Sequence, residues 1–372
     1  MTGIKKLKSG RYQARYFAGY DGAGRRNYPS KTFSHYGDAV KWRTARIREK
    51  DLGQQIENTR MTVSEYLDQW LASKSDLRTN TVKTYTGAIK YIKPYLGGVP
   101  LQSLRPNHLE KWQQDLLKIL AVSTFRVTRT VLGTALKKAV RLRYIYVNPM
   151  SATDPPRRVK SKTKSFDRQQ AQKFIAACKG QRWGLSYKLA LATGLRPEEI
   201  HGLKWSLLDL EGSRGRVSVE EVVVRLPGGG WQFEVPKSDC SHRSIMFSGE
   251  LVSELRAHRA QQLEERMALG RAWHEHDLVF PSAIGTPMNR ADHAAQFRAI
   301  VKLAGIEESF RLYDLRHSFA TLSLLAGVDF KTVSQELGHA NAAFTLDTYA
   351  HVLKEMEVRS SDKRERLLRV KK

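Results

Sequence analysis

Cysteine is scarce in this sequence. Cys178 and Cys240 are the only two among 372 residues, and neither has a cysteine or histidine nearby at the spacing of a metal site. This scarcity excludes a disulfide framework and gives no support to a zinc site. We expect two ordinary thiols, buried or half-buried, and no metal or other cofactor.

Long apolar runs are also missing. No stretch of about 18 or more apolar residues occurs, and no basic amphipathic segment stands alone as a membrane anchor. The basic N-terminus, residues 1–10, lacks the apolar stretch and the small-residue cleavage site of a secretory signal. We therefore expect no membrane partner and a cytoplasmic protein.

Acidic residues are few compared with basic ones. The chain has 63 lysines and arginines against 37 aspartates and glutamates, which gives a formal net charge of +26. The first fifty residues contain 13 basic and 3 acidic residues and so contribute +10 of that charge. A polyanion is the expected partner, and we favour nucleic acid because the sequence has no membrane anchor.

The basic N-terminal segment has the pattern of a small α+β unit. Residues 11–18 alternate in polarity, a turn signal follows, and 26–33 form a second strand-like run. Residues 38–51 have a helical pattern that Gly53 ends. We predict a three-stranded sheet backed by one helix over residues 1–55, able to lay a basic ribbon into a DNA groove; a solvated charged face is the alternative. The candidate DNA contacts are Arg11, Arg15, Arg25 and Arg26.

The next segment, residues 60–150, has the apolar spacing of packed helices. Residues 63–70 and 79–95 repeat apolar side chains every three or four positions. Pro106 suits the first turn of another helix, and 123–143 form a long basic helix. These patterns predict an all-α bundle. The side chains expected to be buried are Val63, Tyr66, Leu67, Trp70, Val82, Tyr85, Ile89 and Ile92.

A linker and a third unit follow the bundle. Residues 151–164 are rich in serine, threonine, proline, arginine and lysine without apolar periodicity, which indicates an exposed linker. Residues 165–350 combine helical runs with a strand-rich stretch over 216–247, in which 226–231 predict a hairpin turn. Ser248 is expected to cap a long helix. We predict a mainly helical α+β unit with a small antiparallel sheet.

Two stretches of the third unit place basic side chains at turns. Gly194 permits a tight turn and Pro197 suits the first position of the next helix, so Arg196 lies at a helix N-terminus, a place that attracts phosphate. Lys237 falls in a turn between two strands, and Arg243 opens the second strand. A lysine in such a turn is usually only a surface residue. We add Arg243 to the candidate DNA contacts.

Three further stretches follow in the same unit. One helix starts near Tyr313 and carries Arg316 a turn later, a short helix ends at His339, and another short helix carries Tyr349. Taken singly, these residues are more readily a structural ion pair, a helix cap and one of 14 tyrosines. Their occurrence together, in this order, favours a common site.

The order of these motifs resembles that of the tyrosine recombinases of the phage integrase family. That family has an arginine after a Thr-Gly-Leu turn, a β-turn lysine, a His-x-x-Arg helix start, a Leu-Gly-His and a C-terminal tyrosine. The departure is Tyr313, which stands where most members have histidine, and a phenol is a poor proton shuttle at neutral pH. His317 is not expected to replace it, because the next helical residue points about 100° away. We interpret His317 as a core histidine.

The resemblance implies a reaction. Tyr349 would attack a DNA phosphodiester and form a 3′-phosphotyrosyl link and a free 5′-hydroxyl, without metal or ATP. Arg196 and Arg316 would clamp the phosphate, and Lys237 would protonate the leaving 5′-oxygen. His339 and Tyr313 would hydrogen-bond phosphate oxygens.

The resemblance also implies domains and partners. Residues 1–55 are similar to arm-binding domains, 60–150 to core-binding domains and 165–350 to catalytic domains. The implied partners are double-stranded DNA with core-type and arm-type attachment sites, a homotetramer, and possible host DNA-bending and excision directionality proteins. The tail, residues 351–372, is either a solvated basic end or a segment that docks on a neighbouring protomer. The implied location is the nucleoid of a bacterial host.

Several functions share parts of this pattern. An integrase of a phage or mobile element is favoured because the basic N-terminal unit suggests a second class of DNA site. A conjugative-transposon or Xer-like recombinase is the close alternative. A catalytically silent DNA-binding protein, with Tyr313 as a sign of decay, belongs to another class. A type IB topoisomerase shares the chemistry, but the small basic head argues against it.

Overall fold

The computed structural model describes most of the chain in two compact units, Met1–Lys160 and Ser161–Lys372. The described residues are 3–20, 24–51, 60–158, 163–226, 228–236, 239–306, 309–339, 343, 345, 346, 348 and 349. Lys237 and the tail, residues 351–372, lie outside them.

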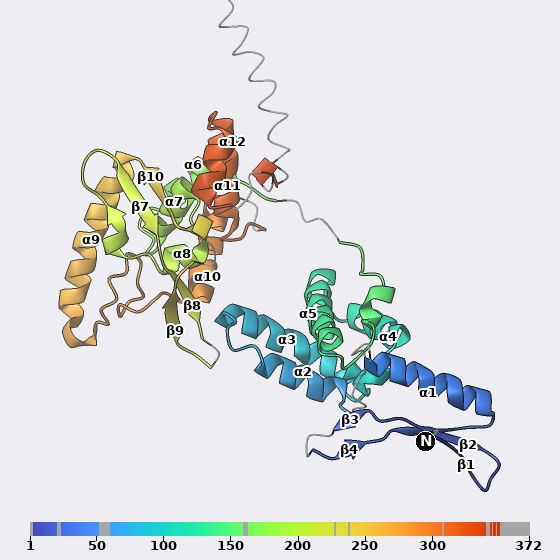
Figure 1. The fold of residues 1–372 in the computed structure, drawn as a ribbon. Helices are drawn as coiled ribbons and strands as arrows, with labels where there is room; N and C mark the ends of the chain where they lie inside the picture. Colours follow the sequence, from blue (N-terminus) through green and yellow to red (C-terminus); the bar gives the residue numbers. More distant parts are fainter. Residues whose placement is uncertain are drawn as a thin grey trace, which may run out of the picture. The chain divides into compact units, whose positions relative to one another are not determined.

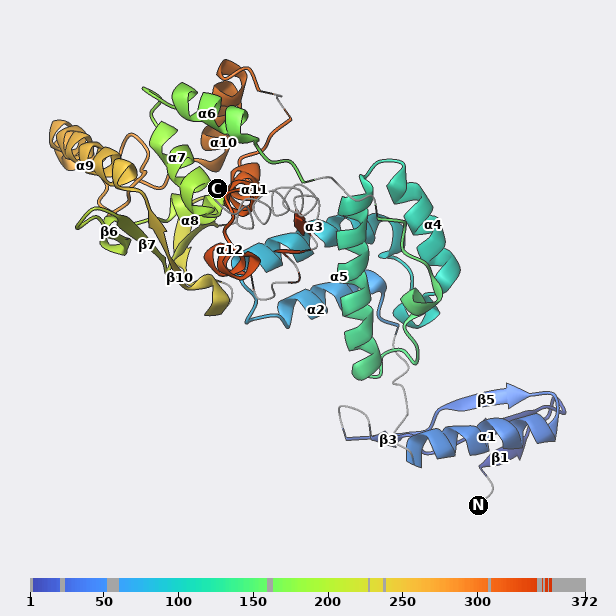
Figure 2. The same ribbon diagram turned by 90° about the horizontal axis from the view of Figure 1, so that it is seen from above.

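A small sheet begins the first unit, and a single helix packs on it (Figures 1 and 2). Its antiparallel strands have the order β1-β2-β5, and β3 and β4 form a separate two-stranded ribbon. The expected second strand over 26–33 is therefore split, and Pro29, which has no N–H to donate to a ladder, lies at the break. The elements are β1 (Ile4–Lys6), β2 (Tyr12–Arg15), β3 (Gly19–Tyr20), β4 (Arg26–Asn27), β5 (Ser30–Phe33) and α1 (Tyr36–Asp51).

Helices form the rest of the first unit. Six of the eight side chains predicted to be in the core are buried, and the other two, Val82 and Tyr85, are half-buried. Thr62 caps the first of these helices in a reciprocal pair with Glu65, and Pro106 occupies the first turn of another helix. The elements are α2 (Val63–Ala72), α3 (Thr79–Leu96), η1 (Leu101–Ser103), α4 (Pro106–Leu117), α5 (Val122–Arg141) and η2 (Pro149–Ala152), where η marks a 3₁₀ helix.

The start of the expected linker is attached to α5. Thr153 is buried, and Arg129 donates to its hydroxyl over 3.0 Å. Arg126 donates to the carbonyl of Pro156 over 2.6 Å. Two residues of the expected linker, Thr153 and Pro156, are thus attached to α5, while most of residues 151–158 are exposed. Their anchors are arginine bonds to a hydroxyl and a backbone carbonyl, which no apolar periodicity can reveal.

The second unit combines a small sheet with helices. In its antiparallel sheet the order is β10-β7-β6, and β8 and β9 form the predicted hairpin. In Figure 1, α9 lies on one side of this sheet and α11 and α12 lie on the other. The strands are β6 (Leu208–Asp209), β7 (Gly215–Val219), β8 (Val222–Arg225), β9 (Trp231–Glu234) and β10 (Arg243–Phe247). The helices are α6 (Arg168–Ala177), α7 (Gly184–Thr193), α8 (Pro197–His201), η3 (Trp205–Leu207), η4 (Asp239–Ser241), α9 (Gly249–Leu269), η5 (Gly270–Ala272), α10 (Arg290–Leu303), α11 (Asp314–Leu325) and α12 (Phe330–Leu337).

The N-terminal cap of α9 and the exposure of one cysteine differ from expectation. Ser248 does precede α9 at the cap position, but its side chain makes no capping hydrogen bond. Cys178 is buried as expected, whereas Cys240 is exposed, and both are free thiols. Among the described residues no helix is both long and apolar enough to cross a bilayer.

The apolar interior of the second unit has two parts. The larger part joins α6, α7, α9 and α10 with the sheet. The smaller part lies between α11 and α12 and includes Phe319, Leu337 and the ring of Tyr349. The candidate nucleophile is therefore held by its own apolar cluster.

Candidate active site

Arg196 is positioned by a tight turn between α7 and α8. Gly194 ends α7 with φ 65°, and a Cβ at this position would lie 2.5 Å from Phe319 of α11. A glycine is needed here for both the backbone conformation and the close approach. Arg196 follows as the N-cap residue of α8, with Pro197 at the first helical position, as the sequence predicted.

Glu199 joins Arg196 to Arg243. Its carboxylate accepts from Arg196 Nη1 at 2.7 Å and from Arg243 Nη1 and Nη2 at 3.0 and 2.8 Å. It also accepts from the backbone N–H of Arg196 at 2.7 Å. Burial alone would raise the pKa of Glu199, but the bonds from Arg243 and the charge of Arg196 hold that pKa below its ordinary value. Sequence reasoning missed this carboxylate, although it stands three residues after Arg196.

Arg243 is turned toward the protein. Besides Glu199, its guanidinium donates to the backbone carbonyls of Glu336, at 2.5 Å, and Ser241, at 3.1 Å. Its side chain is 6% exposed. These bonds fix the position of the guanidinium, and a contact between Arg243 and DNA stays a prediction.

Arg316 links three elements at the centre of the site. It lies in α11, is 1% exposed, and donates to the carbonyls of Gly194, at 2.7 Å, and Leu337. Burial and the neighbouring charge of Arg196 lower its pKa to about 10. The guanidinium is still cationic at neutral pH, so it presents fixed positive charge.

His339 follows the end of α12. Gly338 has φ 62°, and a Cβ there would lie 2.7 Å from the carbonyl oxygen of Cys240. The Nδ1 atom of His339 lies 2.8 Å from Thr345 Oγ1. Burial and the charges of Arg316, Arg196 and Arg243 lower its pKa to about 4. The ring is therefore neutral at physiological pH and suited to hydrogen bonding rather than to charge.

Tyr349 is buried beside α11, at 1% exposure. Its Oη lies 2.7 Å from Nδ1 of His317. Burial raises the pKa of the phenol, and the charge of Arg316 opposes that shift. The interpretation of His317 as a core histidine is therefore wrong: it is half-buried and touches the candidate nucleophile. The helical geometry around Arg316 could not reveal this contact, because Tyr349 comes from a separate segment.

Tyr313 stands at the edge of the same group. It is 42% exposed, and its ring meets the ring of His317 edge-on at a centroid distance of 5.4 Å. Its phenol is close enough to Arg196 and Arg316 to affect their pKa values. The structure thus brings together Arg196, Arg316, His339, Tyr349 and Tyr313. Lys237 lies outside the described residues.

The basic residues of the N-terminal sheet belong to the other unit. The side chains of Arg11, Arg15, Arg25 and Arg26 are all exposed. Arg15 lies over the ring of Tyr28, 5.9 Å from its centroid, and Tyr28 and Tyr20 are exposed as well. Exposed arginines beside exposed aromatic rings suit contacts with nucleic acid.

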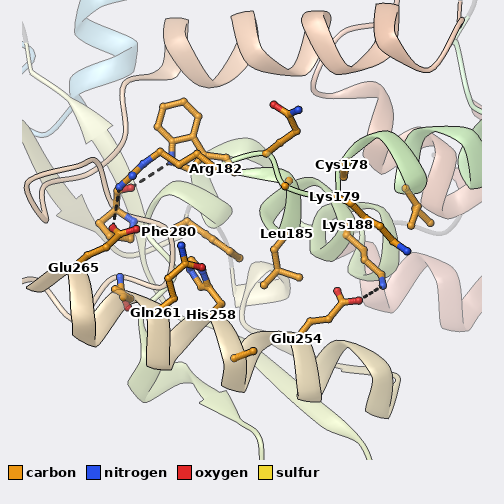
Figure 3. A pocket seen from close by; sticks show the side chains of 18 residues that line it. Cys178, Lys179, Arg182, Leu185, Lys188, Glu254, His258, Gln261, Glu265 and Phe280 are labelled. Atoms are coloured by element: carbon orange, nitrogen blue, oxygen red, sulfur yellow. Dashed lines mark hydrogen bonds and ion pairs between the residues drawn. The ribbon is translucent and has the colours of Figure 1, made fainter.

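A cavity of about 570 Å³ lies elsewhere in the second unit, between the start of α7 and α9 (Figure 3). Two of its basic side chains pair with acidic ones: Lys188 with Glu254 at 2.6 Å and Arg182 with Glu265 at 3.3 Å. None of the described candidate catalytic residues lines it. The arginine, histidine and tyrosine groups described above therefore lie outside this cavity.

The arrangement suits a phosphodiester. Two arginines supply permanent positive charge, a neutral histidine supplies a hydrogen-bonding group, and a tyrosine supplies an oxygen nucleophile. Within the described ranges no group of three or more histidine, cysteine, aspartate or glutamate side chains could hold a metal ion.

Family comparisons match most of the chain, in three separate ranges. "Phage integrase family" matches residues 164–356, "Phage integrase, N-terminal SAM-like domain" matches 62–117, and "Phage integrase, N-terminal domain" matches 3–52.

Individual proteins are similar over most of their length. The ICEBs1 integrase of Bacillus subtilis is 24% identical over 98% of this chain and 100% of its own length. An integrase of Streptomyces ambofaciens is 28% identical, covering 82% of this chain and 79% of its own. A XerC-like tyrosine recombinase of Caldanaerobacter subterraneus is 26% identical, covering 81% and 82%.

Solved structures share the fold. The Tn1549 transposon integrase in complex with transposon right end DNA has a TM-score of 0.69 at 21% identity, covering 82% of this chain and 99% of that one. A lambda integrase dimer bound to a COC′ core site has a TM-score of 0.55 at 17% identity, covering 94% and 95%.

Proposed function

Since the chain belongs to the phage integrase family of tyrosine recombinases, which break and rejoin DNA, we propose that Tyr349 is its nucleophile. The observation that carries this proposal is the convergence of Arg196, Arg316, His339 and Tyr349 from separate elements of one unit. The sequence contains many tyrosines, and the buried guanidinium of Arg316 lies close enough to Tyr349 to affect the pKa of its hydroxyl.

The proposed cleavage step forms one bond and breaks one. Tyr349 Oη attacks the phosphorus, the bond from phosphorus to the 5′-oxygen breaks, and a 3′-phosphotyrosyl link remains. Negative charge grows on the non-bridging oxygens, where Arg196 and Arg316 oppose it with planar forks that cannot lose their charge at neutral pH. His339 and Tyr313 supply hydrogen bonds to the same oxygens.

Lys237 is proposed as the acid for the leaving group. The 5′-oxygen departs as an alkoxide unless a proton reaches it, and an ammonium on the β9–β10 turn can supply one. The support is the position of the residue in the sequence, between β9 and Arg243 of β10. In the rejoining step the same group, now neutral, accepts the proton of the attacking 5′-hydroxyl.

The substrate is proposed to be an attachment site of a mobile element and one of its bacterial host. The ICEBs1 integrase, a transposase from transposon Tn916 and a putative prophage phiRv2 integrase are among the relatives, and the similarity to the ICEBs1 integrase spans both chains almost completely. We propose that the described bundle and catalytic unit bind core-type sites and that the N-terminal sheet binds arm-type sites. A phage integrase and a conjugative-element integrase fit equally well.

Assembly and location extend this proposal. Strand exchange needs two duplexes, each cut on both strands, which requires four tyrosines. Lambda integrase is seen as a tetramer on a Holliday junction, and we propose a homotetramer here, with residues 351–372 docking on a neighbouring protomer. A host DNA-bending protein and an excision directionality factor are proposed partners. The action is proposed to occur in the cytoplasm, at the host chromosome.

A suicide duplex tests the proposal. The duplex carries the core site of the element with a nick next to the cleavage point, so that the short 5′-hydroxyl product diffuses away and the adduct accumulates. Wild type should give a covalent adduct on a denaturing gel, and Tyr349→Phe should give none. Tyr95→Phe, at a tyrosine that is 42% exposed in the other unit, is the matched control and should keep the adduct. Binding without any adduct in wild type would identify a silent DNA-binding protein instead.

A further inference from the structure

The hydroxyl of Tyr349 has a partner that can accept its proton. Nδ1 of His317 lies 2.7 Å from Tyr349 Oη, and the two ring centroids are 5.8 Å apart. This is hydrogen-bond distance between a nucleophile and a potential base. His317 directly follows Arg316 in α11, so the residue that fixes the phosphate charge and this imidazole share one rigid helix.

We propose that His317 is the general base of the cleavage step and takes the proton of Tyr349 as its oxygen attacks the phosphodiester. The inference rests on the proposed function, because it needs Tyr349 to be the nucleophile. It adds a catalytic residue that touches a reacting atom.

Tyr349 needs such a base. The residue is 1% exposed, and burial raises the pKa of its phenol above the ordinary value. Bulk water therefore has little access to the proton, and spontaneous ionisation at neutral pH is rarer than for a free phenol. A base in direct contact removes both obstacles.

His317 has the protonation state that the role requires. Burial is the largest influence and lowers its pKa; the charge of Asp314 opposes this shift, and the charge of Arg316 adds to it. The imidazole is therefore neutral at physiological pH, and with its proton on Nε2 it accepts at Nδ1.

Two other residues are less suited to this task. Nδ1 of His339 is 2.8 Å from Thr345 Oγ1, and burial together with the arginines around His339 makes it a weak base with a pKa of about 4. Tyr313, at the position where the family usually has histidine, is a phenol itself. Its ring packs edge-on against the ring of His317, on which the imidazole can rest while Nδ1 contacts Tyr349.

The proton can be followed through both steps. In cleavage, Tyr349 Oη–H gives its proton to Nδ1 of His317, Oη bonds to phosphorus, and the bond from phosphorus to the 5′-oxygen breaks. In rejoining, the 5′-hydroxyl attacks the phosphotyrosine, the bond from phosphorus to Oη breaks, and the imidazolium returns the proton to Oη. His317 ends the cycle neutral, as it began.

A substrate with sulfur as the leaving atom separates this role from that of Lys237. In a 5′-bridging phosphorothiolate duplex a thiolate leaves, and because it is a weak base it needs no acid catalyst. His317→Asn is the test variant, since its Oδ1 can still accept the hydrogen bond of Tyr349 but cannot take up a proton. Lys237→Ala is the comparison. Single-turnover cleavage is measured for each full-length protein on the oxygen and the sulfur duplexes.

We expect His317→Asn to cleave both duplexes roughly 10²- to 10⁴-fold more slowly than wild type, and Lys237→Ala to recover on the sulfur duplex. Wild-type rates for His317→Asn, or its recovery on the sulfur duplex, would overturn the proposal. The proposed function fails separately, if wild type forms no adduct or if Tyr349→Phe retains it.

The pH dependence of wild type gives a second measurement that does not depend on a variant folding. On the sulfur duplex the rate should fall with acid once His317 is protonated, at a pH below the ordinary histidine value of about 6.5. The charged or titratable groups that face His317 are Asp314, Arg316, Tyr313, Tyr349 and His339. The acid fall should persist in His339→Asn, and a rate that is constant from pH 7.5 to about 4.5 would refute the role.

Discussion

Glu199 holds two of the site's arginines in place. Its carboxylate is 3% exposed and bonds the side chains of Arg196 and Arg243, and Arg243 also bonds the backbone near the end of α12. One carboxylate and two guanidinium groups together carry a net positive charge, which favours a phosphate, and the carboxylate fixes the positions of both guanidinium groups. The residue therefore positions Arg196 without needing to touch DNA.

Glu199→Gln should destabilise the second unit and slow cleavage. Removing the charge leaves two arginines uncompensated in a buried place, and breaking such a pair costs about 3 to 5 kcal/mol. Denaturant unfolding measures the loss, and single-turnover cleavage under native conditions measures the effect on Arg196. Glu198→Gln, on the same helix but half-buried, is the control and should change the free energy of unfolding by less than about 1 kcal/mol. Equal effects of the two variants would contradict the role of Glu199.

The sequence could reveal some of these residues and not others. Arg196, Arg316, His339 and Tyr349 stand in recognisable local motifs, and the structure brings them together. Arg243, the second partner of Glu199, comes from β10, and the partner of His317 comes from the segment of Tyr349; both are distant in the chain. Only the folded structure shows these pairs, because a spacing rule within one helix cannot report a contact with another element.

At the scale of elements, two left-handed glycines allow α7, α11 and α12 to meet. The carbonyl of Gly194 and that of Leu337, next to Gly338, accept from the same guanidinium of Arg316. Gly338 also lies against the carbonyl of Cys240 just before β10. The helix ends are thus fixed to one another through their backbones, and His339 extends directly from this junction.

Gly338→Ala should cost more stability than an alanine at an open left-handed glycine. Gly305→Ala is the matched control, since Gly305 has φ 66° with nothing near the added Cβ, whereas Gly338 has φ 62° and the Cys240 carbonyl at 2.7 Å. Both variants force an alanine into the left-handed conformation, which costs more than about 1 kcal/mol. Only Gly338→Ala also creates a steric clash. Urea unfolding should therefore rank Gly338→Ala as the less stable, with slower cleavage, and a reversed order would contradict the crowding.

A buried histidine pair joins α7, α8 and α10. His293 lies 3.0 Å from His201 and 2.9 Å from Ser186 Oγ, and both histidines are at most 5% exposed. Burial, helped by Arg290 and Arg225, lowers the pKa of His201 to about 4. Burial and the proximity of His201 lower the pKa of His293 to about 2.

Acid should therefore destabilise this unit. Below about pH 6.5 the unfolded chain binds protons at these histidines, whereas the folded chain does not. The contribution of the pair to the free energy of unfolding is therefore constant above that pH, and it falls as the pH is lowered from about 6.5 to about 4. Each histidine that stays neutral contributes a slope of about 1.4 kcal/mol per pH unit. Urea unfolding at pH 7, 6 and 5 measures the slope. His201→Asn should reduce it and His274→Gln, at an exposed histidine, should not; unchanged stability from pH 7 to 5 would contradict the pair's neutrality.

At the scale of the whole molecule, positive charge is distributed over both units and concentrated in the first fifty residues. The net charge of +26 makes binding to DNA depend on counterion release, so affinity should fall steeply as salt is added. The composition alone predicted this partner class. It could not reveal that the beginning of the linker is bound to α5, because those contacts involve hydroxyls and carbonyls.

Replacing Arg11, Arg15, Arg25 and Arg26 together by Gln should weaken binding to arm-type DNA. Each lost phosphate contact removes about 0.9 from the slope of log affinity against log salt concentration. Fluorescence anisotropy over a salt series measures this slope for arm-type and core-type duplexes. Core-type binding should keep its slope, and an unchanged slope on the arm-type duplex would refute the assignment of the N-terminal sheet.

The unequal exposure of the two cysteines has a practical consequence. Cys178 is buried and its pKa is raised to about 12 by that burial, so it has little reactive thiolate, whereas Cys240 is exposed. A maleimide dye added to the natural chain should therefore attach at one place. That place is three residues after Lys237 in the sequence, and the carbonyl of Cys240 lies beside Gly338. Cys240 is thus a natural position for a fluorescent or spin label beside the proposed active site, and a label there should report the binding of DNA over time without any substitution in the chain.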